Sequence, residues 1–387
     1  MKHKLKHGHG SKQQASWKMG VLAWFLAGPV FLAGGGLAAA DPWDDTVAKG
    51  KEEGKVVIVM GGAASREFAP IFPVFEKKFG IQVIGSSGSG RESADRILAE
   101  RRAGIHTADL WYGGTATMNT RLVPQKVLDP VEPELILPEV VDTSKWWGGK
   151  RWYGDHESKY ILLFAATPSN NFSVNTKLVD LNKINSFFDL LDPKWKGKIV
   201  SRDPSSTGVG LTILSWYAHP KLGKDFIRRL YTEMNVTLVR DFRQGADWLA
   251  KGKFAFYIMP GRARQDVEKL AQLGLPVQNV YKPLKEGAEL GVGGTSSAAV
   301  INNRPHPYAA RVFLNWWLSR DGQIAFMNAG KEDDSMRIDI PKDVLEERLR
   351  RKSNVEYIFS EADPEIQKLF SEAFDYASTV LKGAGLK

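Results

Sequence analysis

Hydroxyl-bearing residues and glycine are concentrated in SRDPSSTGVG, residues 201–210. This stretch follows a short apolar segment, GKIV, and precedes a second apolar run, LTILSWYAH, so the pattern predicts a strand, a bend and the beginning of a helix. Such a bend directs unpaired backbone N–H groups and the hydroxyls of Ser205, Ser206 and Thr207 toward one point. Because the N-terminus of a helix favours negative charge, we expect the bend to bind an anion. Ser205 alone would also serve as a helix cap.

Three earlier loops, each after a predicted strand, are rich in small and hydroxyl-bearing residues: GGAAS at 61–65, SSGSG at 86–90 and GGTAT at 113–117. In open α/β sheets, ligands bind outside the carboxyl ends of the strands. We therefore expect the three loops to form one shared rim, although each loop alone would also fit a compact connection. The candidate ligand-binding residues of this rim are Ala64, Ser65, Arg66, Ser87, Ser89 and Thr115.

Arginines recur close to the segments that could hold an anion, namely Arg66, Arg91, Arg243 and Arg262. A guanidinium group can donate two parallel hydrogen bonds to a carboxylate or a phosphate. Each of the four also fits a solvent-exposed position, so the sequence leaves open which of them contacts a ligand. Tyr257 is a further candidate, and its strand-like periodicity fits a core position equally well.

The segment KRWYGDHESKY, residues 150–160, brings acidic and aromatic residues close together. Asp155 and His156 are the candidate binding residues, because acidic and aromatic groups can recognise an amine. A ligand bound there as well as by the anion-binding loop would be zwitterionic. A polar hinge loop is the alternative interpretation.

Strand-like and helix-like patterns alternate along most of the chain, which indicates an α/β fold with parallel strands. KVVIVM (55–60), IQVIG (81–85) and ADLWYGG (108–114) are the first predicted strands. After the apolar stretch at 160–176 the alternation begins again, so a second lobe is expected from about residue 165.

Composition restricts the class of protein further. The 387 residues include 53 Lys and Arg against 44 Asp and Glu, but residues 1–40 hold five Lys and no acidic residue. Without them the balance is 48 against 44, about +4, which gives nucleic-acid binding little support. There is no cysteine, which excludes disulfides, thiolate metal sites and a cysteine nucleophile.

Residues 1–40 have the features of a secretory signal peptide: a basic beginning, an uncharged run from Met19, and LAAA before Asp41. Cleavage near Ala40 would release the protein into the periplasm. A membrane anchor is the alternative, and Pro29 together with the Gly34–Gly36 run weakens it.

From residue 54 to about 330 the chain resembles the extracellular solute-binding proteins of bacterial ABC importers, in the branch of the ferric-binding proteins. The resemblance rests on FPVFEKKFGIQV, ADLWYGG, LLDPKWKGKIVSRDPSSTG, WLAKGKFAFYIMPGR and YAARVFLNWWLSRDGQIAF. It implies two α/β lobes joined by crossover strands, a type II-like periplasmic-binding-protein fold, with a ligand held between the lobes and delivered to a membrane permease.

The resemblance also implies an expected division of the chain. Residues 41–163 would begin the first lobe, 164–285 would form the second, and 286–330 would return to the first. Residues 331–387 would be a C-terminal helical segment that packs mainly on the second lobe. The charges of 331–352 look like those of a solvent-exposed cover.

The ferric-binding members hold their metal with two adjacent tyrosines before a Gly-Arg, together with a histidine from the first loop and a glutamate from the third. Here Ile258 and Met259 stand where the tyrosine pair would be, and the two loops offer neither a histidine nor a carboxylate. A hard trivalent cation needs anionic oxygen ligands. We therefore expect no metal and no cofactor, and ferric binding is kept as the alternative.

Enzyme motifs are missing from the sequence. The segment GSGRES at 88–93 lacks the last glycine of a dinucleotide fingerprint, and there is no Walker loop, H-E-x-x-H or G-x-S-x-G motif. We expect a monomeric, periplasmic binding protein that captures a small organic anion, such as a phosphonate, sugar phosphate, sulfonate or carboxylate, for an ABC permease. An exported hydrolase and a binding protein that signals through a receptor are the weaker alternatives.

Overall fold

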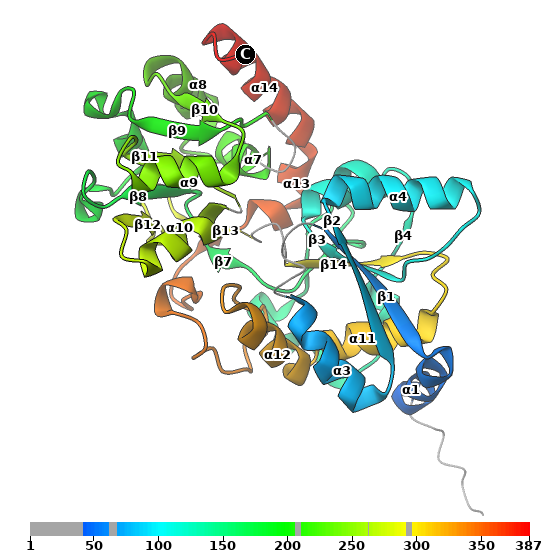
Figure 1. Ribbon diagram of the computed structural model, residues 1–387. Helices are drawn as coiled ribbons and strands as arrows, with labels where there is room; N and C mark the ends of the chain where they lie inside the picture. Colours follow the sequence, from blue (N-terminus) through cyan, green and yellow to red (C-terminus); the bar gives the residue numbers. More distant parts are fainter. Residues whose placement is uncertain (1–41, 62–67, 206–209, 262, 292–295) are drawn as a thin grey trace, which may run out of the picture. The chain divides into compact units, whose positions relative to one another are not determined.

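Strand and helix alternate from residue 42 onward, as the periodicity of the sequence predicts (Figure 1). The computed structural model describes residues 42–61, 68–205, 210–261, 263–291 and 296–387. Its strands form two large sheets and one small sheet. The predicted α/β class is therefore confirmed. Within the described ranges, no helix is both long enough and apolar enough to cross a membrane.

A seven-stranded sheet with its covering helices forms the first lobe. In this sheet β1, β2 and β3 run parallel, and β14 returns antiparallel beside β3. The order is β2-β1-β3-β14-β6-β5, with β4 paired to β14. The strands are β1 (Lys55–Gly61), β2 (Gln82–Gly88), β3 (Leu110–Gly113), β4 (Leu128–Asp129), β5 (Trp152–Tyr153), β6 (Leu162–Leu163) and β14 (Ser297–Ile301).

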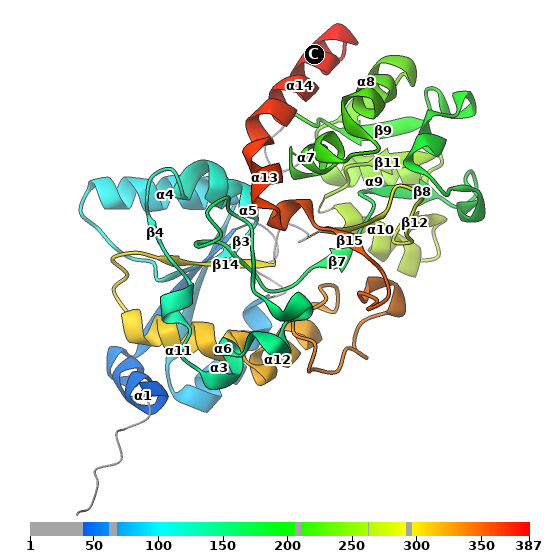
Figure 2. The same cartoon turned by 180° about the vertical axis from the view of Figure 1, so that it is seen from behind.

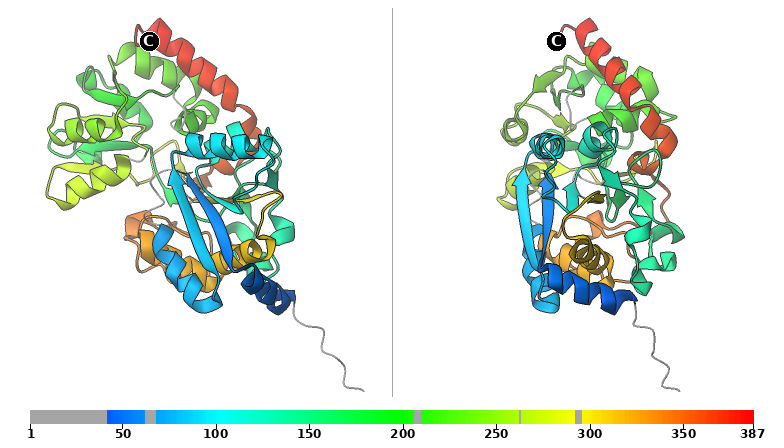
Figure 3. Two further views of the ribbon diagram at one scale, coloured as in Figure 1. Left: turned by 45° about the vertical axis from the view of Figure 1, so that its right-hand side comes forward. Right: turned by 90° about the vertical axis from the view of Figure 1, so that its right-hand side faces the viewer.

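The helices of the first lobe have clear local signals in the sequence. Gly80 adopts φ 70° and ends α3, Pro307 begins α11, and the Ser319 side chain caps α12. Helices α4 and α11 pack on β1, and α1 lies along α11 (Figure 3). The bounds are α1 (Pro42–Glu53), α3 (Phe72–Phe79), α4 (Gly90–Arg102), α5 (Thr115–Thr117), α6 (Pro138–Val141), α11 (Pro307–Leu318) and α12 (Arg320–Gly330).

A five-stranded sheet, in the order β10-β9-β11-β8-β12, is the centre of the second lobe. Strands β9, β10 and β11 are parallel, whereas β8 is antiparallel to β11 and to β12. Successive side chains of a strand point to opposite faces, so Ile199 and Val200 belong to different cores. The strands are β8 (Phe172–Asn175), β9 (Ile199–Arg202), β10 (Thr237–Val239), β11 (Phe256–Ile258) and β12 (Val277–Asn279).

Helices cover both faces of this second sheet. One core contains side chains of α7, α8 and α14, and the other contains side chains of α9 and α10. Helix α14 lies against α7 and α8 (Figure 3). The bounds are α7 (Gly210–Ala218), α8 (Gly223–Glu233), α9 (Phe242–Ala250), α10 (Ala263–Gln272), α13 (Pro364–Lys368) and α14 (Phe370–Gly383).

The chain crosses between the two large sheets through a small three-stranded sheet of β7 (Thr167–Pro168), β13 (Ala288–Gly291) and β15 (Tyr357–Ile358). Strand β7 follows β6 and leads to β8, and β13 leads back to β14. Strand β15 comes from the C-terminal part of the chain and pairs with β13 (Figure 2). Three segments far apart in the sequence thus meet at the crossover.

The segment 331–352 is not entirely the solvent-exposed cover that its charges predict. Asp334 is fully buried and Arg337 is 1% exposed. Arg337 forms an isolated β-bridge with Trp146, and its guanidinium donates to the carboxylate of Asp339 and to the carbonyl of Leu318. These charged residues are paired inside the first lobe, because a buried charge is tolerated only with partners.

Candidate functional site

The rim of the first lobe is formed by the carboxyl ends of its parallel strands. Gly61 at the end of β1 is in register with Gly88 at the end of β2, and Met60 is in register with Tyr112 of β3. The three strands therefore end at the same edge of the sheet, as expected for a shared rim. Ser87 lies opposite Met60 in this register and is solvent-exposed.

Ser89 and Thr115 make hydrogen bonds within the protein at this rim. The Ser89 hydroxyl accepts the backbone N–H of Glu92 at 3.2 Å, and the Glu92 carboxylate accepts the N–H of Ser89, which is a capping box for α4. Thr115 is buried, and its hydroxyl donates to the carboxylate of Glu361 at 3.2 Å. The C-terminal part of the chain therefore contacts the third loop.

The second lobe has its corresponding rim at the ends of β9, β10 and β11. After β9 the chain turns at Asp203, whose carboxylate accepts the Ser205 N–H at 2.9 Å and the Ser205 hydroxyl at 2.7 Å. Burial opposes ionisation of Asp203, but these bonds and the ammonium group of Lys387, 3.3 Å away, hold its pKa below the usual range. The turn is thus fixed by its own side chains before the helix begins.

Arg202, the last residue of β9, was not among the residues that the sequence pointed to. It is 7% exposed, and its Nε and Nη1 atoms are buried without a hydrogen-bond partner in the described part of the chain. Its guanidinium carbon lies 3.4 Å from the centre of the Phe242 ring. Burial lowers the pKa of Arg202. The only available signal was a charged residue at the end of an otherwise apolar strand, directly before the serine-rich loop.

Tyr257 lies under the second rim rather than at its surface. It is fully buried, and its hydroxyl donates to the Phe242 carbonyl at 3.3 Å. Gly245 of α9 contacts the face of the ring so closely that an added Cβ would lie 2.5 Å from a ring carbon. Burial raises the pKa of Tyr257. The phenol group therefore holds α9 against the sheet, while Arg243 of the same helix is exposed.

Asp155 and His156 have different environments in the loop before β6. Asp155 is 1% exposed, and its carboxylate accepts the backbone N–H groups of Lys159, Tyr160 and Ile161 at 2.8–3.1 Å. His156 is exposed to solvent. The carboxylate thus organises the loop and is already saturated by amide donors.

Six of the predicted ligand-binding residues lie outside the described residues. They are Ala64, Ser65, Arg66, Ser206, Thr207 and Arg262. Their assignment to the site remains a prediction from the sequence.

Glu289 is a second buried charged residue that the sequence did not indicate. It lies on the crossover strand β13, 3% exposed, and its Oε2 accepts the Ser215 hydroxyl at 2.9 Å and the Asn171 amide at 3.4 Å. Its Oε1 has no partner in the described ranges. Burial raises the pKa of this carboxyl group to about 7. A group that titrates near neutral pH thus lies where the chain passes between the sheets.

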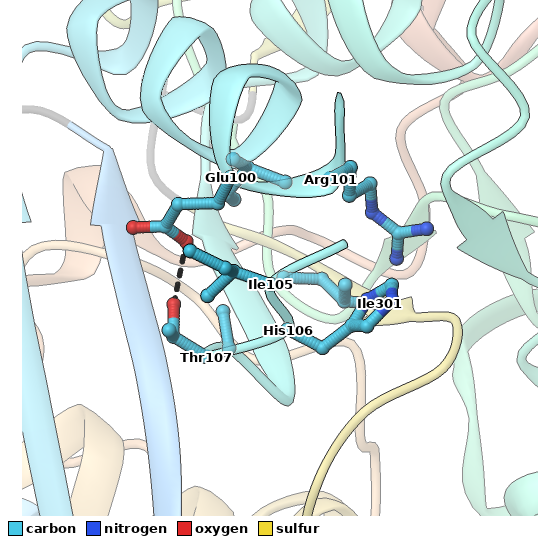
Figure 4. Close-up of a pocket in the computed structure, with 8 residues that line it drawn as sticks. Glu100, Arg101, Ile105, His106, Thr107 and Ile301 are labelled. Carbon is cyan, nitrogen blue, oxygen red and sulfur yellow. Dashed lines mark hydrogen bonds between the residues drawn. The ribbon is translucent and has the colours of Figure 1, made fainter. Parts of the chain in front are cut away.

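A small pocket lies far from both rims, where the chain enters β3 (Figure 4). Glu100, Arg101 and His106 are among its lining residues, and Glu100 accepts the hydroxyl of Thr107 at 2.6 Å. Its volume of about 10 Å³ is no larger than a single water requires. Among the described residues, no three His, Asp or Glu side chains are placed to hold a metal ion.

Known proteins share this architecture. Iron-bound HitA from Pseudomonas aeruginosa superposes with a TM-score of 0.58 at 19% identity, covering 84% of this chain and 99% of that one. AfuA from Actinobacillus pleuropneumoniae, with fructose-6-phosphate bound, superposes with a TM-score of 0.57 at 18% identity, covering 86% and 99%. At these identities the similarity concerns the fold.

In sequence, an uncharacterized protein of Haemophilus influenzae is 26% identical over 266 residues, which are 65% of this chain and 68% of that protein. The sequence pattern of the bacterial extracellular solute-binding proteins matches residues 72–332, well over half of the chain. The resemblance inferred from the sequence is thereby confirmed: the chain belongs to the family of bacterial extracellular solute-binding proteins.

Proposed function

We propose that the protein captures a small organic anion between the rims of its two lobes and delivers it to an ABC permease from the periplasm. The observation that carries the proposal is Arg202, a buried arginine at the base of a serine-rich loop, whose Nε and Nη1 atoms make no hydrogen bond within the described part of the chain. Buried polar groups are nearly always hydrogen-bonded, so unpaired ones call for an explanation. An anionic ligand would complete these bonds and neutralise the charge.

The residues before Gly261 favour an organic anion over ferric iron. Ile258 and Met259 are buried in the apolar core of the second lobe, and the Tyr257 hydroxyl is bonded to a backbone carbonyl. A ferric site needs several anionic oxygen ligands, and these three side chains supply none. HitA binds iron and AfuA binds fructose-6-phosphate on the same fold. The fold therefore accommodates both kinds of ligand, and the side chains at the site determine which one is bound.

The crossover strands provide the means of capture. Strands β7 and β13 connect the two large sheets, and hinge closure about such connections is a common response to ligand. A ligand that contacts both rims stabilises the closed state, because those contacts form only when the lobes meet. Binding and release then suffice for the role, and no catalytic group is required.

A thermal-shift screen tests the proposal. The purified protein is heated with phosphonates, sugar phosphates, sulfonates, carboxylates, amino acids and ferric salts. A ligand at 100 times its dissociation constant adds about 2.7 kcal/mol to the free energy of unfolding. We expect stabilisation by one class of organic anion, whereas stabilisation by ferric salts alone would contradict the proposal.

The anion found by the screen allows a test of the loop. Ser206→Ala combined with Thr207→Ala should weaken its binding by about 1 to 3 kcal/mol, through hydrogen bonds lost to a charged group. Ser371→Ala, at an exposed position of α14, is the matched control. Unchanged affinity of the double variant in calorimetry would remove the loop from the site.

A further inference from the structure

A cavity of about 840 Å³ lies outside both rims. One wall is the end of β12 with residues 278–283, and another is the C-terminal strap, residues 346–357. Pro168 of the crossover strand β7 also lines it. In Figure 2 the strap and β15 run beside β7 and β12. The volume is within the range of small-molecule sites in proteins.

An ion-pair network holds the strap in place. Arg348 donates two hydrogen bonds to Glu268 of α10, at 2.9 and 2.8 Å, and a third to Glu346 at 2.7 Å. Its guanidinium lies 5.1 Å from the centre of the Tyr281 ring, and the Tyr281 hydroxyl donates to Glu268 at 2.9 Å. Bidentate pairs of this kind are rigid. The charge of Arg348 is therefore neutralised, and the wall is preformed.

Two other basic side chains of the cavity, Lys282 and Arg350, have no close carboxylate among the residues that the structure describes. The ammonium of Lys282 donates to the Leu181 carbonyl at 2.6 Å and to the Asn185 side-chain oxygen at 3.3 Å, both neutral acceptors. The guanidinium of Arg350 donates to the carbonyl of Leu345 at 2.8 Å. Its ion-pair partner, the Asp343 carboxylate, is 3.8 Å away and 92% exposed, so the pair contributes little.

We propose that this cavity is a second binding site, for a small organic anion with two or more carboxylate groups that bridges Lys282 and Arg350. The anion would supply a counter-charge to Lys282, which has no ion pair among the described residues, and to Arg350 a closer one than Asp343. Tyr281 and Tyr357 give the cavity aromatic surface for the carbon skeleton. Glu347 at the strap is already paired with Lys352 at 3.3 Å. The site uses none of the residues assigned to the rims, so it is independent of the proposed function.

Occupancy of this site would act on the crossover. The cavity is lined by β7, by the end of β12 and by Tyr357 of β15, which pairs with β13. A molecule that touches these elements contacts one connection between the large sheets, β7, directly and the other, β13, only through its partner strand β15. Any effect that it has on ligand affinity at the rims must be matched by an equal effect in the reverse direction.

Calorimetric titration with citrate at fixed ionic strength tests the site. We expect saturable binding with a dissociation constant below about 1 mM. Lys282→Gln and Arg350→Gln should each weaken it by about tenfold, because each removes a charge-assisted contact. Lys196→Gln, at an exposed lysine of the same lobe that does not line the cavity, is the control and should leave it unchanged.

Two further variants separate the site from the rims and from misfolding. Val355→Trp fills the cavity without removing any charge, so it should abolish citrate binding even if Arg350→Gln proves unstable in a thermal unfolding control. Arg202→Gln should leave the citrate binding that depends on Lys282 unchanged, which distinguishes this site from any citrate bound at the rims. Absence of saturation, or binding that is sensitive to Arg202→Gln and insensitive to Lys282→Gln, would overturn the second site while leaving the function proposed for the rims untouched.

Discussion

Buried charged residues of the first lobe form ion pairs, whereas Arg202 and Glu289, near the second lobe, form none among the described residues. In the first lobe, Glu134 is held by Arg304 at 2.6 Å and by Arg311 at 2.9 Å. Burial opposes its ionisation, but these two ion pairs keep the pKa of Glu134 below its usual range. In the second lobe and at the crossover, Arg202 and Glu289 retain buried atoms without hydrogen bonds in the described ranges.

The difference separates structural charges from candidate functional ones. A buried charge held by an ion pair contributes to a fixed architecture, even where one atom, such as Arg304 Nε, makes no hydrogen bond in the described ranges. A buried charge without an ion pair is costly to keep, and such groups are concentrated at functional sites. We therefore propose that the paired charges serve stability and that Arg202 and Glu289 serve ligand binding and the hinge.

The largest expected effect concerns the paired carboxylate of the first lobe. Glu134→Gln should lower the free energy of unfolding by about 4 kcal/mol, because Arg304 and Arg311 both lose their shared counter-charge and Arg304 keeps only Asp129, at 2.8 Å. Urea denaturation measures the change, with Glu157→Gln at the exposed loop as the control. A loss below about 1 kcal/mol would show that the first-lobe pairs are not structural.

Glu289→Gln should raise the free energy of unfolding at alkaline pH, whereas Glu134→Gln should lower it. A carboxyl group with a raised pKa binds its proton more tightly in the folded protein than in the unfolded chain, where its pKa is about 4.5. Its stabilising contribution is complete below pH 4.5 and is lost as the pH rises through about 7. At pH 8 the variant should be more stable than the wild type by about 3 kcal/mol, and at pH 4.5 the two should unfold alike.

Urea denaturation at several pH values measures this difference in the free energy of unfolding directly. If the free energy of unfolding depended on pH in the same way in the wild type and in Glu289→Gln, Glu289 would not be the group that titrates near neutral pH. Arg202 would then be the only residue left to support the contrast between the two lobes.

Arg202→Gln should affect binding more than stability. The variant loses a charged donor to the anion, so affinity should fall by about 2 kcal/mol, or thirtyfold. The free energy of unfolding should change little, because two nitrogen atoms of the side chain make no hydrogen bond in the described ranges. Calorimetry and urea denaturation measure the two effects. A large loss of stability with unchanged affinity would make Arg202 a structural residue like Glu134.

The smallest effect is expected at the first rim. Ser89→Ala removes the cap of α4 and should cost about 1 kcal/mol of stability. Because the Ser89 hydroxyl already serves the helix, ligand affinity should be nearly unchanged. A marked loss of ligand affinity in Ser89→Ala would show that Ser89 contacts the ligand. Both rims would then bind the ligand directly through their side chains.

Much of the architecture could be predicted from the sequence, because local patterns encode it. The alternation of apolar segments predicts the α/β class, and the small residues after β1, β2 and β3 mark the edge where these strands end together. The capping box at Ser89 and Glu92 is likewise a local signal. Strand order is not local, since 133 residues separate the end of β6 from the beginning of β14, its neighbour in the first sheet.

Burial of charge was the feature that sequence reasoning missed. The residue type alone does not distinguish a buried arginine or glutamate from an exposed one. The burial of Arg202, Glu289 and Arg337 depends on neighbours that are distant in the chain. Arg337 lies within ion-pair distance of Glu139, nearly two hundred residues earlier, so the charged segment after residue 330 could not be distinguished from a solvated surface. Asp155 is the converse case, because the amides it binds lie four to six residues ahead.

We propose that an organic anion binds at the base of the serine-rich loop. The crystal structure of the complex with the anion that stabilises the protein most strongly is the most direct test of this proposal. We predict an oxyanion group within hydrogen-bond distance of Arg202 and of residues 205–207. Two results would contradict this proposal. One is a metal ion bound beside residues 257–259, and the other is an anion bound away from both rims and out of contact with Arg202.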